Sequence, residues 1–143
     1  MLTQAQVEFR VLDARKMNDF VSDSFDLVID KGTLDAMICG RTGIKDVGRM
    51  MREIFRVLRS PGSYVLISHM DFASDEMQSL LQEVIMPTLD QNRALQWNLA
   101  VHEADHDNTA TVYVFCSQPK RFTRQMMTQP TTLPKKISTF DGN

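Results

Sequence analysis

The chain has 143 residues, enough for one domain with a hydrophobic core and too few for two. Hydrophobic residues make up 43% of the sequence and charged residues 24%, and the net charge of −2 exerts no long-range attraction on nucleic acid or on an anionic membrane. No apolar run is long enough to span a bilayer, and the first residues do not resemble a signal peptide. We therefore expect a cytoplasmic protein with no nucleic-acid or membrane partner.

The first predicted elements are two strands. Residues 7–12 alternate apolar and polar side chains, which predicts a short strand that ends at Asp13. Residues 25–30 have a nearly continuous apolar centre, which indicates a second strand, buried on both faces and closed by Gly32.

From Asp46 the hydrophobic period becomes that of an amphipathic helix, with Asp46 as its cap and residues 60–62 (Ser-Pro-Gly) as its end. The four arginines beside its apolar stripe are expected to form a solvated face. A further apolar strand is predicted at residues 64–67. The stripe of the helix comprises Val47, Met50, Met51, Ile54, Phe55 and Leu58.

Ser74 caps a second predicted helix, and Pro87 is expected to terminate it. Residues 95–101 and 111–116 are rich in strand-forming residues and flank a short polar loop, which predicts an antiparallel hairpin at a sheet edge. The buried face of the second helix comprises Met77, Leu80, Leu81, Val84 and Ile85.

These elements predict an α/β fold, a Rossmann-like mixed sheet with parallel strands in its centre and an antiparallel hairpin at its C-terminal end. We expect a domain over residues 1–118 and a flexible tail over residues 119–143, which has too few apolar residues to offset its ordering entropy. Cys39 and Cys116 lie in apolar surroundings and are expected to be buried thiols.

Ligands of open α/β sheets bind outside the carboxyl ends of the strands. The residues at predicted strand ends are Asp13-Ala14, Asp30-Lys31-Gly32 and Ser68-His69. Asp13 and Asp30 could accept hydrogen bonds from a polar ligand, or they could only cap the following turns. His69 could contact a substrate or be an exposed loop residue.

Residues 102–106 (His-Glu-Ala-Asp-His) match the zinc-peptidase pattern H-E-x-x-H. That motif places both imidazoles on one face of a helix, whereas here it follows an alternating strand and enters a polar loop. No third ligand is evident, so we expect surface histidines and no metal site.

The segment from Ser24 to Ala36 (Ser-Phe-Asp-Leu-Val-Ile-Asp-Lys-Gly-Thr-Leu-Asp-Ala) resembles the signature of a eukaryotic methyltransferase-like family that includes lysine methyltransferases of a translation elongation factor. Members of that family are class I methyltransferases that use S-adenosyl-L-methionine. Residues 13–15, 53–62 and 112–116 resemble further parts of the family pattern, with Ser63 in place of its second glycine. The resemblance covers about residues 7 to 118.

The resemblance implies roles for these strand-end residues. Asp13 would accept the adenine amino group of the cofactor, with the Ala14 backbone beside it. Asp30, Lys31 and Gly32 would border the methionyl part, where glycine permits close approach of the backbone. Asp30 or Asp35 would be catalytic by orienting the amine of a protein lysine, since positioning supplies most of the rate of such a displacement. The resemblance also implies a protein substrate as partner, such as a translation factor.

The sequence departs from the family at its beginning. The family fold starts with two strands and a glycine-rich turn, and the chain begins at what would be the third strand. None of the glycines is spaced G-x-G: they are Gly32, Gly40, Gly43, Gly48, Gly62 and Gly142.

Three expectations follow from this departure. The isolated chain would bind S-adenosylmethionine weakly or not at all, its first strand would be detached or re-paired, and a central strand would become an edge able to form a homo-oligomer. The alternatives to an active or truncated protein lysine methyltransferase are an inactive interaction module and a methyltransferase of small molecules.

Overall fold

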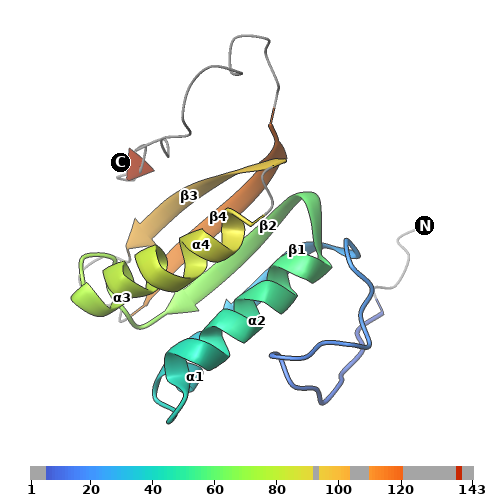
Figure 1. Ribbon diagram of the computed structural model, residues 1–143, viewed down its shortest axis with the longest axis horizontal. Helices are drawn as coiled ribbons and strands as arrows, with labels where there is room; N and C mark the ends of the chain where they lie inside the picture. Colours follow the sequence, from blue (N-terminus) through green and yellow to red (C-terminus); the bar gives the residue numbers. More distant parts are fainter. Residues whose placement is uncertain (1–5, 92–93, 104–109, 121–137, 140–143) are drawn as a thin grey trace.

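The computed structural model describes residues 6–91, 94–103, 110–120 and 138–139 (Figure 1). Its strands form one mixed sheet in the order β1-β2-β4-β3-β5. The strands are β1 (Phe25–Lys31), β2 (Leu58–Ser68), β3 (Leu95–Glu103), β4 (Thr111–Pro119) and β5 (Ser138–Thr139). The helices are α1 (Thr33–Ile38), α2 (Gly43–Val57), α3 (Asp75–Leu80), the π-helical turn η1 (Leu81–Ile85) and α4 (Met86–Leu89).

The sheet combines one parallel pair with an antiparallel hairpin, which confirms the predicted mixed α/β fold. β1 and β2 are parallel, β2 and β4 are antiparallel, and β3 and β4 form the predicted hairpin. Of the predicted tail, only β5 and residues 119–120 are described, and β5 pairs in parallel with β3. The remaining tail residues, and the polar loop predicted at 105–108, lie outside the described residues.

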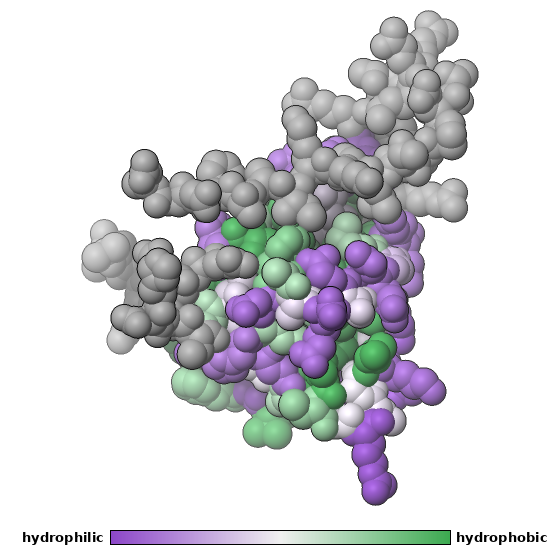
Figure 2. Space-filling view, turned by 90° about the vertical axis from the view of Figure 1, so that its left-hand side faces the viewer, coloured by the Kyte–Doolittle hydropathy of each residue, from purple (hydrophilic) through white to green (hydrophobic). Residues whose placement is uncertain are grey.

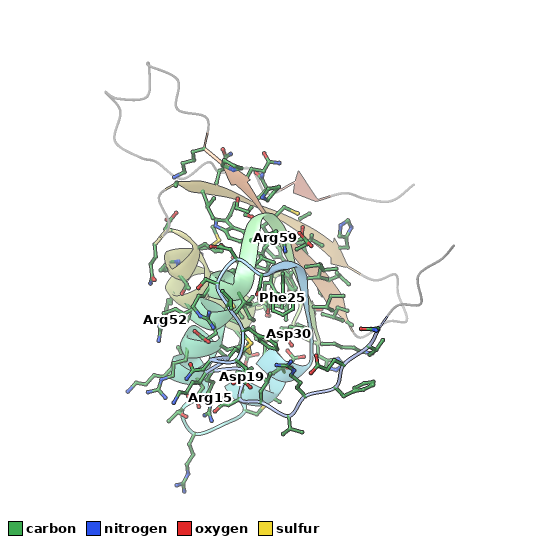
Figure 3. All side chains as sticks on the ribbon, turned by 90° about the vertical axis from the view of Figure 1, so that its right-hand side faces the viewer. Arg15, Asp19, Phe25, Asp30, Arg52 and Arg59 are labelled. Atoms are coloured by element: carbon green, nitrogen blue, oxygen red, sulfur yellow. The ribbon has the colours of Figure 1, made fainter. Side chains whose placement is uncertain are left out.

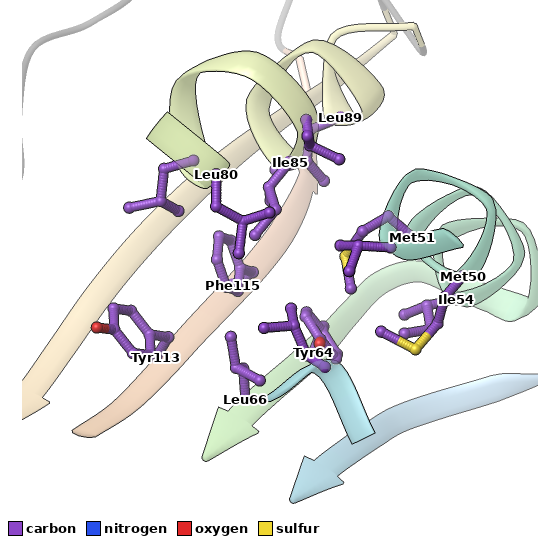
Figure 4. Close-up of a cluster of buried hydrophobic side chains, with 14 of the residues drawn as sticks. Met50, Met51, Ile54, Tyr64, Leu66, Leu80, Ile85, Leu89, Tyr113 and Phe115 are labelled. Atoms are coloured by element: carbon purple, nitrogen blue, oxygen red, sulfur yellow. The ribbon is translucent and has the colours of Figure 1, made fainter. Parts of the chain in front are cut away.

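The helices lie on one face of the sheet (Figure 1). The alternation along β2 reflects this: Tyr64, Leu66 and Ser68 are buried, and the residues between them are half-buried. Hydrophilic residues cover much of the side of the molecule shown in Figure 2, with hydrophobic patches between them. Figure 4 shows the core between the layers: Met50, Met51, Ile54, Tyr64, Leu66, Leu80, Ile85, Leu89, Tyr113 and Phe115.

α2 carries the predicted apolar stripe, with Val47, Met50, Met51 and Ile54 buried. It begins one turn earlier than predicted, at Gly43, and Asp46 lies inside the first turn, where its carboxylate accepts a hydrogen bond from the Thr42 hydroxyl (2.5 Å). A carboxylate in the first turn is stabilised by the helix dipole.

The predicted turn at residues 60–62 lies within β2, so this strand begins at Leu58 and not at Tyr64. Phe25 pairs with Leu58 but Leu27 pairs with Ser63, so residues 59–62 bulge out of the ladder. Only glycine fits at Gly62, because a Cβ there would lie 2.2 Å from the Arg59 carbonyl oxygen.

Ser74 caps α3 as predicted, its hydroxyl accepting a hydrogen bond from the Met77 N–H (3.2 Å). The prediction that Pro87 ends the helix was wrong, because the helical path continues to Leu89. Proline lacks an N–H and its ring collides with the carbonyl four residues earlier. The π-helical turn η1 directly precedes α4, in which Pro87 is the second residue, and we attribute the continuation of the helix through Pro87 to this wider turn.

The prediction of a strand at residues 7–12 was also wrong. These residues form no strand, and Val7, Phe9 and Val11 are 74%, 92% and 107% exposed. Of the two expectations for this segment, detached or re-paired, the structure shows the detached one, because no described strand pairs with residues 7–12. Figures 1 and 3 place the N-terminal segment on the β1 side of the molecule.

Residues 13–24 are held against α2 by Glu53 and Arg56. The Met17 N–H donates to Glu53 Oε2 (2.7 Å), and the Arg56 guanidinium donates to the carbonyls of Met17 (2.9 Å) and Phe20 (2.8 Å). Arg56 therefore binds this segment and does not only face solvent. Arg49, Arg52 and Arg59 are exposed, and of these Arg59 also reaches the segment, donating to the Ser24 carbonyl (2.9 Å).

β1 was predicted to be buried on both faces, and this was wrong. Asp30 faces the helices, whereas Leu27 and Ile29 on the other face are 49% and 61% exposed. Within the described ranges, no strand pairs with the outer edge of β1. The predicted burial of the cysteines was wrong for Cys39, which is exposed, while Cys116 is half-buried, and both are free thiols. No described helix is long and apolar enough to cross a membrane.

Candidate functional site

The carboxyl ends of β1 and β2 meet at one edge of the sheet, as the parallel pairing requires. Asp30 pairs with Leu66 and Lys31 with Ile67, and the Gly32 N–H donates to the Ile67 carbonyl (3.3 Å). The structure thus brings two of the three predicted strand-end groups, residues 30–32 and 68–69, to adjacent positions.

Gly32 makes the turn from β1 into α1. Its φ of +78° lies in the left-handed region, which favours glycine, and it is the N-cap residue of α1. A Cβ built on Gly32 would have no atom within 4 Å, so the space beside its backbone is open. The exposed Lys31 precedes it. This turn can therefore be approached closely by a ligand.

The Asp30 side chain points into the protein and is 5% exposed. Its Oδ1 accepts the Thr33 N–H (2.9 Å), and its Oδ2 accepts the Tyr64 hydroxyl (3.2 Å). Burial of the Tyr64 ring and hydroxyl raises the Tyr64 pKa well above its usual value, and the negative charge of Asp30 raises it further. Asp30 acts in this geometry by fixing the turn at residues 31–33.

Asp35 connects α1 to the end of β2. Its Oδ1 accepts the Ser68 hydroxyl (2.5 Å) and its Oδ2 accepts the His69 N–H (3.2 Å), while Ser68 Oγ also accepts the Met70 N–H (3.1 Å). Ser68 is buried, Asp35 is half-buried and His69 is exposed. Asp35 is the more accessible of the two candidate catalytic carboxylates, and it also fastens the loop after β2.

Asp13 lies in a network of charges at the N-terminus of α2. Arg15 donates to both oxygens of Asp13 (2.9 and 2.8 Å) and to Asp46 Oδ2 (3.1 Å). The hydrogen bonds from Arg15 lower the Asp13 pKa to about 2 and the Asp13 carboxylate raises the Arg15 pKa. The hydrogen bond from Thr42 is the largest cause that lowers the Asp46 pKa.

This network places Asp13, and Ala14 next to it, at the N-terminus of α2, although no strand carries them there (Figure 3 shows Arg15). The Asp13 carboxylate already has a cationic partner in Arg15, so an adenine amino group would have to share or replace it.

No local sequence pattern indicates Tyr64 or Ser68 as a partner of these carboxylates. Tyr64 was predicted only as an apolar residue of a strand. Its hydroxyl reaches Asp30 because the two side chains lie on the same face of the sheet. Ser68 was named as a strand-end residue but not as the partner of Asp35. The acidic residue two positions before Arg15 was the only local signal for that pairing.

No group of three or more metal-ligating side chains occurs among the residues the structure describes. His102 of the H-E-x-x-H pattern is exposed and lies on the strand β3, not on a helix. Residues 104–106 of the pattern lie outside the described ranges.

Comparison with known proteins gives the family. The family model described as a methyltransferase domain matches residues 2–127. The chain belongs to this family of methyltransferase domains. Family membership confirms the resemblance that residues 24–36 suggested, and the strand-end turn at residues 30–33 lies inside the matched region.

Two relatives match parts of this methyltransferase-family chain. The citrate synthase-lysine N-methyltransferase of Danio rerio, mitochondrial, is 39% identical over 64 residues, which are 44% of this chain and 25% of the relative. The eEF1A lysine and N-terminal methyltransferase of the same species is 35% identical over 96 residues, 67% of this chain and 12% of the relative. The matches thus span a quarter of these relatives or less.

Among solved structures, a protein from Thermus thermophilus assigned as a DNA modification methylase has a TM-score of 0.50 with this chain. It is 18% identical, and the superposition covers 83% of this chain and 53% of that one. At this identity the likeness supports the Rossmann-like methyltransferase fold alone.

Proposed function

We propose that this chain is part of a cytoplasmic S-adenosyl-L-methionine-dependent methyltransferase that modifies lysine of a protein. The observation that carries the proposal is the turn at residues 30–33, a left-handed glycine with open space beside it at the carboxyl end of β1. The family membership supports the chemistry, and the names of the two Danio rerio relatives support protein lysine as the acceptor.

The residues of the turn fit a cofactor at this position. The Gly32 backbone and Lys31 would border its methionyl part, and Asp13 and the Ala14 backbone would hold the adenine after Arg15 has moved or shared its partner. The bound cofactor supplies a methyl group activated by a sulfonium centre. Because Asp30 fixes the turn through Thr33 and Tyr64, its contribution is to hold the Gly32 backbone in place.

Asp35 is the better placed residue to orient an incoming lysine amine. It is half-buried at the same edge of the sheet, and each of its oxygens has a single hydrogen-bond donor in the described structure, so each can accept another. Such an acceptor would hold the neutral amine in line with the methyl group and need not remove its proton before transfer.

The proposal includes weak cofactor binding by the 143 residues alone. The sequence has no G-x-G turn, and within the described ranges the outer edge of β1 has no neighbouring strand. The contacts supplied by residues 13–14 and 30–32 therefore form one side of a crevice.

The test is a methyl-transfer assay on the product of the longest reading frame that contains these residues. We expect radiolabelled methyl from S-adenosylmethionine to appear on lysine when elongation factor 1A or citrate synthase is supplied, and Asp35→Asn to lower the rate. Transfer to small amines only would replace the protein acceptor by a small molecule. No transfer and no cofactor binding would contradict the proposed activity.

One observation favours a second candidate function, an inactive module that self-associates. Leu27 and Ile29 on β1 are exposed although both are apolar, and β1 has an unpaired edge among the described strands. Light scattering after size-exclusion chromatography would show a dimer that Leu27→Lys with Ile29→Lys converts to a monomer. A monomeric wild type would rule this candidate out.

A further inference from the structure

A groove runs between α2 and the segment formed by η1 and α4, on the outer side of the helix layer. Its volume is about 470 Å³. One wall comes from α2 and the other from residues 83–91. None of its lining residues belongs to the strand-end turn described above.

The α2 wall of this groove is basic. Lys45, Arg49 and Arg52 line it, against Glu83 as the one carboxylate of the lining, in a chain whose net charge is −2. Arg49 has a distant ion-pair partner in Asp46 (3.6 Å). In the part of the chain that the structure describes, Lys45 and Arg52 have no ion-pair partner, and Figure 3 shows Arg52 extending from the helix side of the molecule.

The spacing and the floor of the groove define what fits it. Lys45, Arg49 and Arg52 follow an i, i+4, i+7 pattern, which places them in one row along the helix. Gly48 contributes no side chain beneath this row, and Val84, which would lie 3.6 Å from a Cβ at that position, forms the apolar part of the floor. Ile44, 60% exposed, adds an apolar contact at the end of the row.

We propose that this groove binds an acidic segment of a partner protein. Carboxylates spaced along the segment would face the row of cations, and an apolar side chain between them would cover Gly48 and Val84. This inference does not depend on the proposed methyl transfer. A nucleic acid is disfavoured because Glu83 stands on the opposite wall and a phosphate backbone carries no apolar side chain to cover Val84.

The test uses the whole 143-residue chain and a fluorescein-labelled peptide with glutamates at i, i+4 and i+7 and leucines between them. Fluorescence anisotropy should show saturable binding that weakens with added salt. Lys45→Glu with Arg52→Glu should weaken it at least about tenfold and should give binding to the same peptide with lysine for glutamate. The matched control is Lys16→Glu with Lys120→Glu, which changes the net charge equally outside the groove and should retain wild-type affinity for the glutamate peptide.

Four results would overturn the proposal: no binding of the glutamate peptide to the wild type, equal binding of a glutamine analogue, an unchanged affinity of the groove variant, or tighter binding of single-stranded polyuridine. Lys16, Lys45 and Arg52 are exposed and Lys120 is half-buried just after the end of β4, so both double variants should keep the circular dichroism spectrum of the wild type, and the melting temperature of each is compared with that of the wild type. That measurement separates a lost contact from a lost fold.

Discussion

Replacing Tyr64 by phenylalanine tests whether the buried Tyr64–Asp30 contact holds the candidate site together. The hydroxyl of Tyr64 donates to Asp30 Oδ2 (3.2 Å), and the ring stacks on Phe115 (centroids 5.6 Å) and meets the edge of Phe55 (5.9 Å). Phenylalanine keeps both ring contacts, so the substitution removes only the hydrogen bond.

The expected loss follows from the burial of both partners. Tyr64 is 0% exposed and Asp30 is 5% exposed, and a hydrogen bond to a charged group contributes about 1.5–3 kcal/mol. The comparison variant is Tyr113→Phe: the Tyr113 hydroxyl donates to the uncharged Met70 carbonyl (2.7 Å), a bond that by itself should contribute about 1 kcal/mol.

Urea denaturation followed by circular dichroism and by the fluorescence of Trp97, the single tryptophan, gives the free energies of unfolding. A double-mutant cycle with Asp30→Asn should give a coupling energy of about 1 kcal/mol or more. A cost of Tyr64→Phe no greater than that of Tyr113→Phe, together with an absence of coupling in the cycle, would refute a stabilising Tyr64–Asp30 hydrogen bond.

Three further predictions concern the same site. Gly32→Ala should lower the free energy of unfolding by about 1–2 kcal/mol through backbone strain at φ +78°, with Gly32→Asn less costly, and equal stability of the two variants and the wild type would contradict the left-handed turn. A carboxyl-detected NMR titration should give Asp13 a pKa of about 2 that returns toward 3.8 in Arg15→Gln. Because the Asp13 pKa is lowered in the folded state, the stability that the ionised carboxylate contributes is present above pH 3.8 and is lost as the pH falls toward 2. A wild-type midpoint near 3.8 would exclude the ion pair. The raised Tyr64 pKa acts in the opposite direction: the stability that the protonated hydroxyl contributes is complete below pH 10.0 and is lost as the pH rises further. The difference in unfolding free energy between wild type and Tyr64→Phe should therefore shrink above pH 10. A constant difference would argue against a buried, protonated hydroxyl.

The sequence predicted the elements that periodicity determines. The stripe of α2 and the alternation along β3 and β4 are each set by the need to bury one face, and the hairpin register follows from that alternation. The strand-end position of Asp30-Lys31-Gly32 could be predicted equally, because the apolar run of β1, residues 27–29, ends directly before Asp30.

The misses occurred where neighbours decide the outcome. Residues 7–12 have a strand pattern, but a strand needs a partner, and within the described structure none lies beside them. Leu27 and Ile29 are exposed because nothing in the described structure covers their face of β1. Pro87 is tolerated because the preceding turn is π-helical, which no local pattern indicated.

The roles of the site carboxylates could be predicted only in part. Sequence position placed Asp30 and Asp35 near a strand end but could not tell an inward carboxylate from an accessible one. That distinction depends on Tyr64 and Ser68, which lie more than thirty residues away in the chain and reach the carboxylates only through the pairing of β1 with β2.

The most direct test of the proposed cofactor site is a calorimetric titration of the 143-residue chain with S-adenosylmethionine and with S-adenosylhomocysteine. If residues 13–14 and 30–32 form only one side of the crevice, neither compound should give saturable heat at micromolar concentrations, while the chain remains folded by circular dichroism. Saturable micromolar binding with one site per chain would contradict this account.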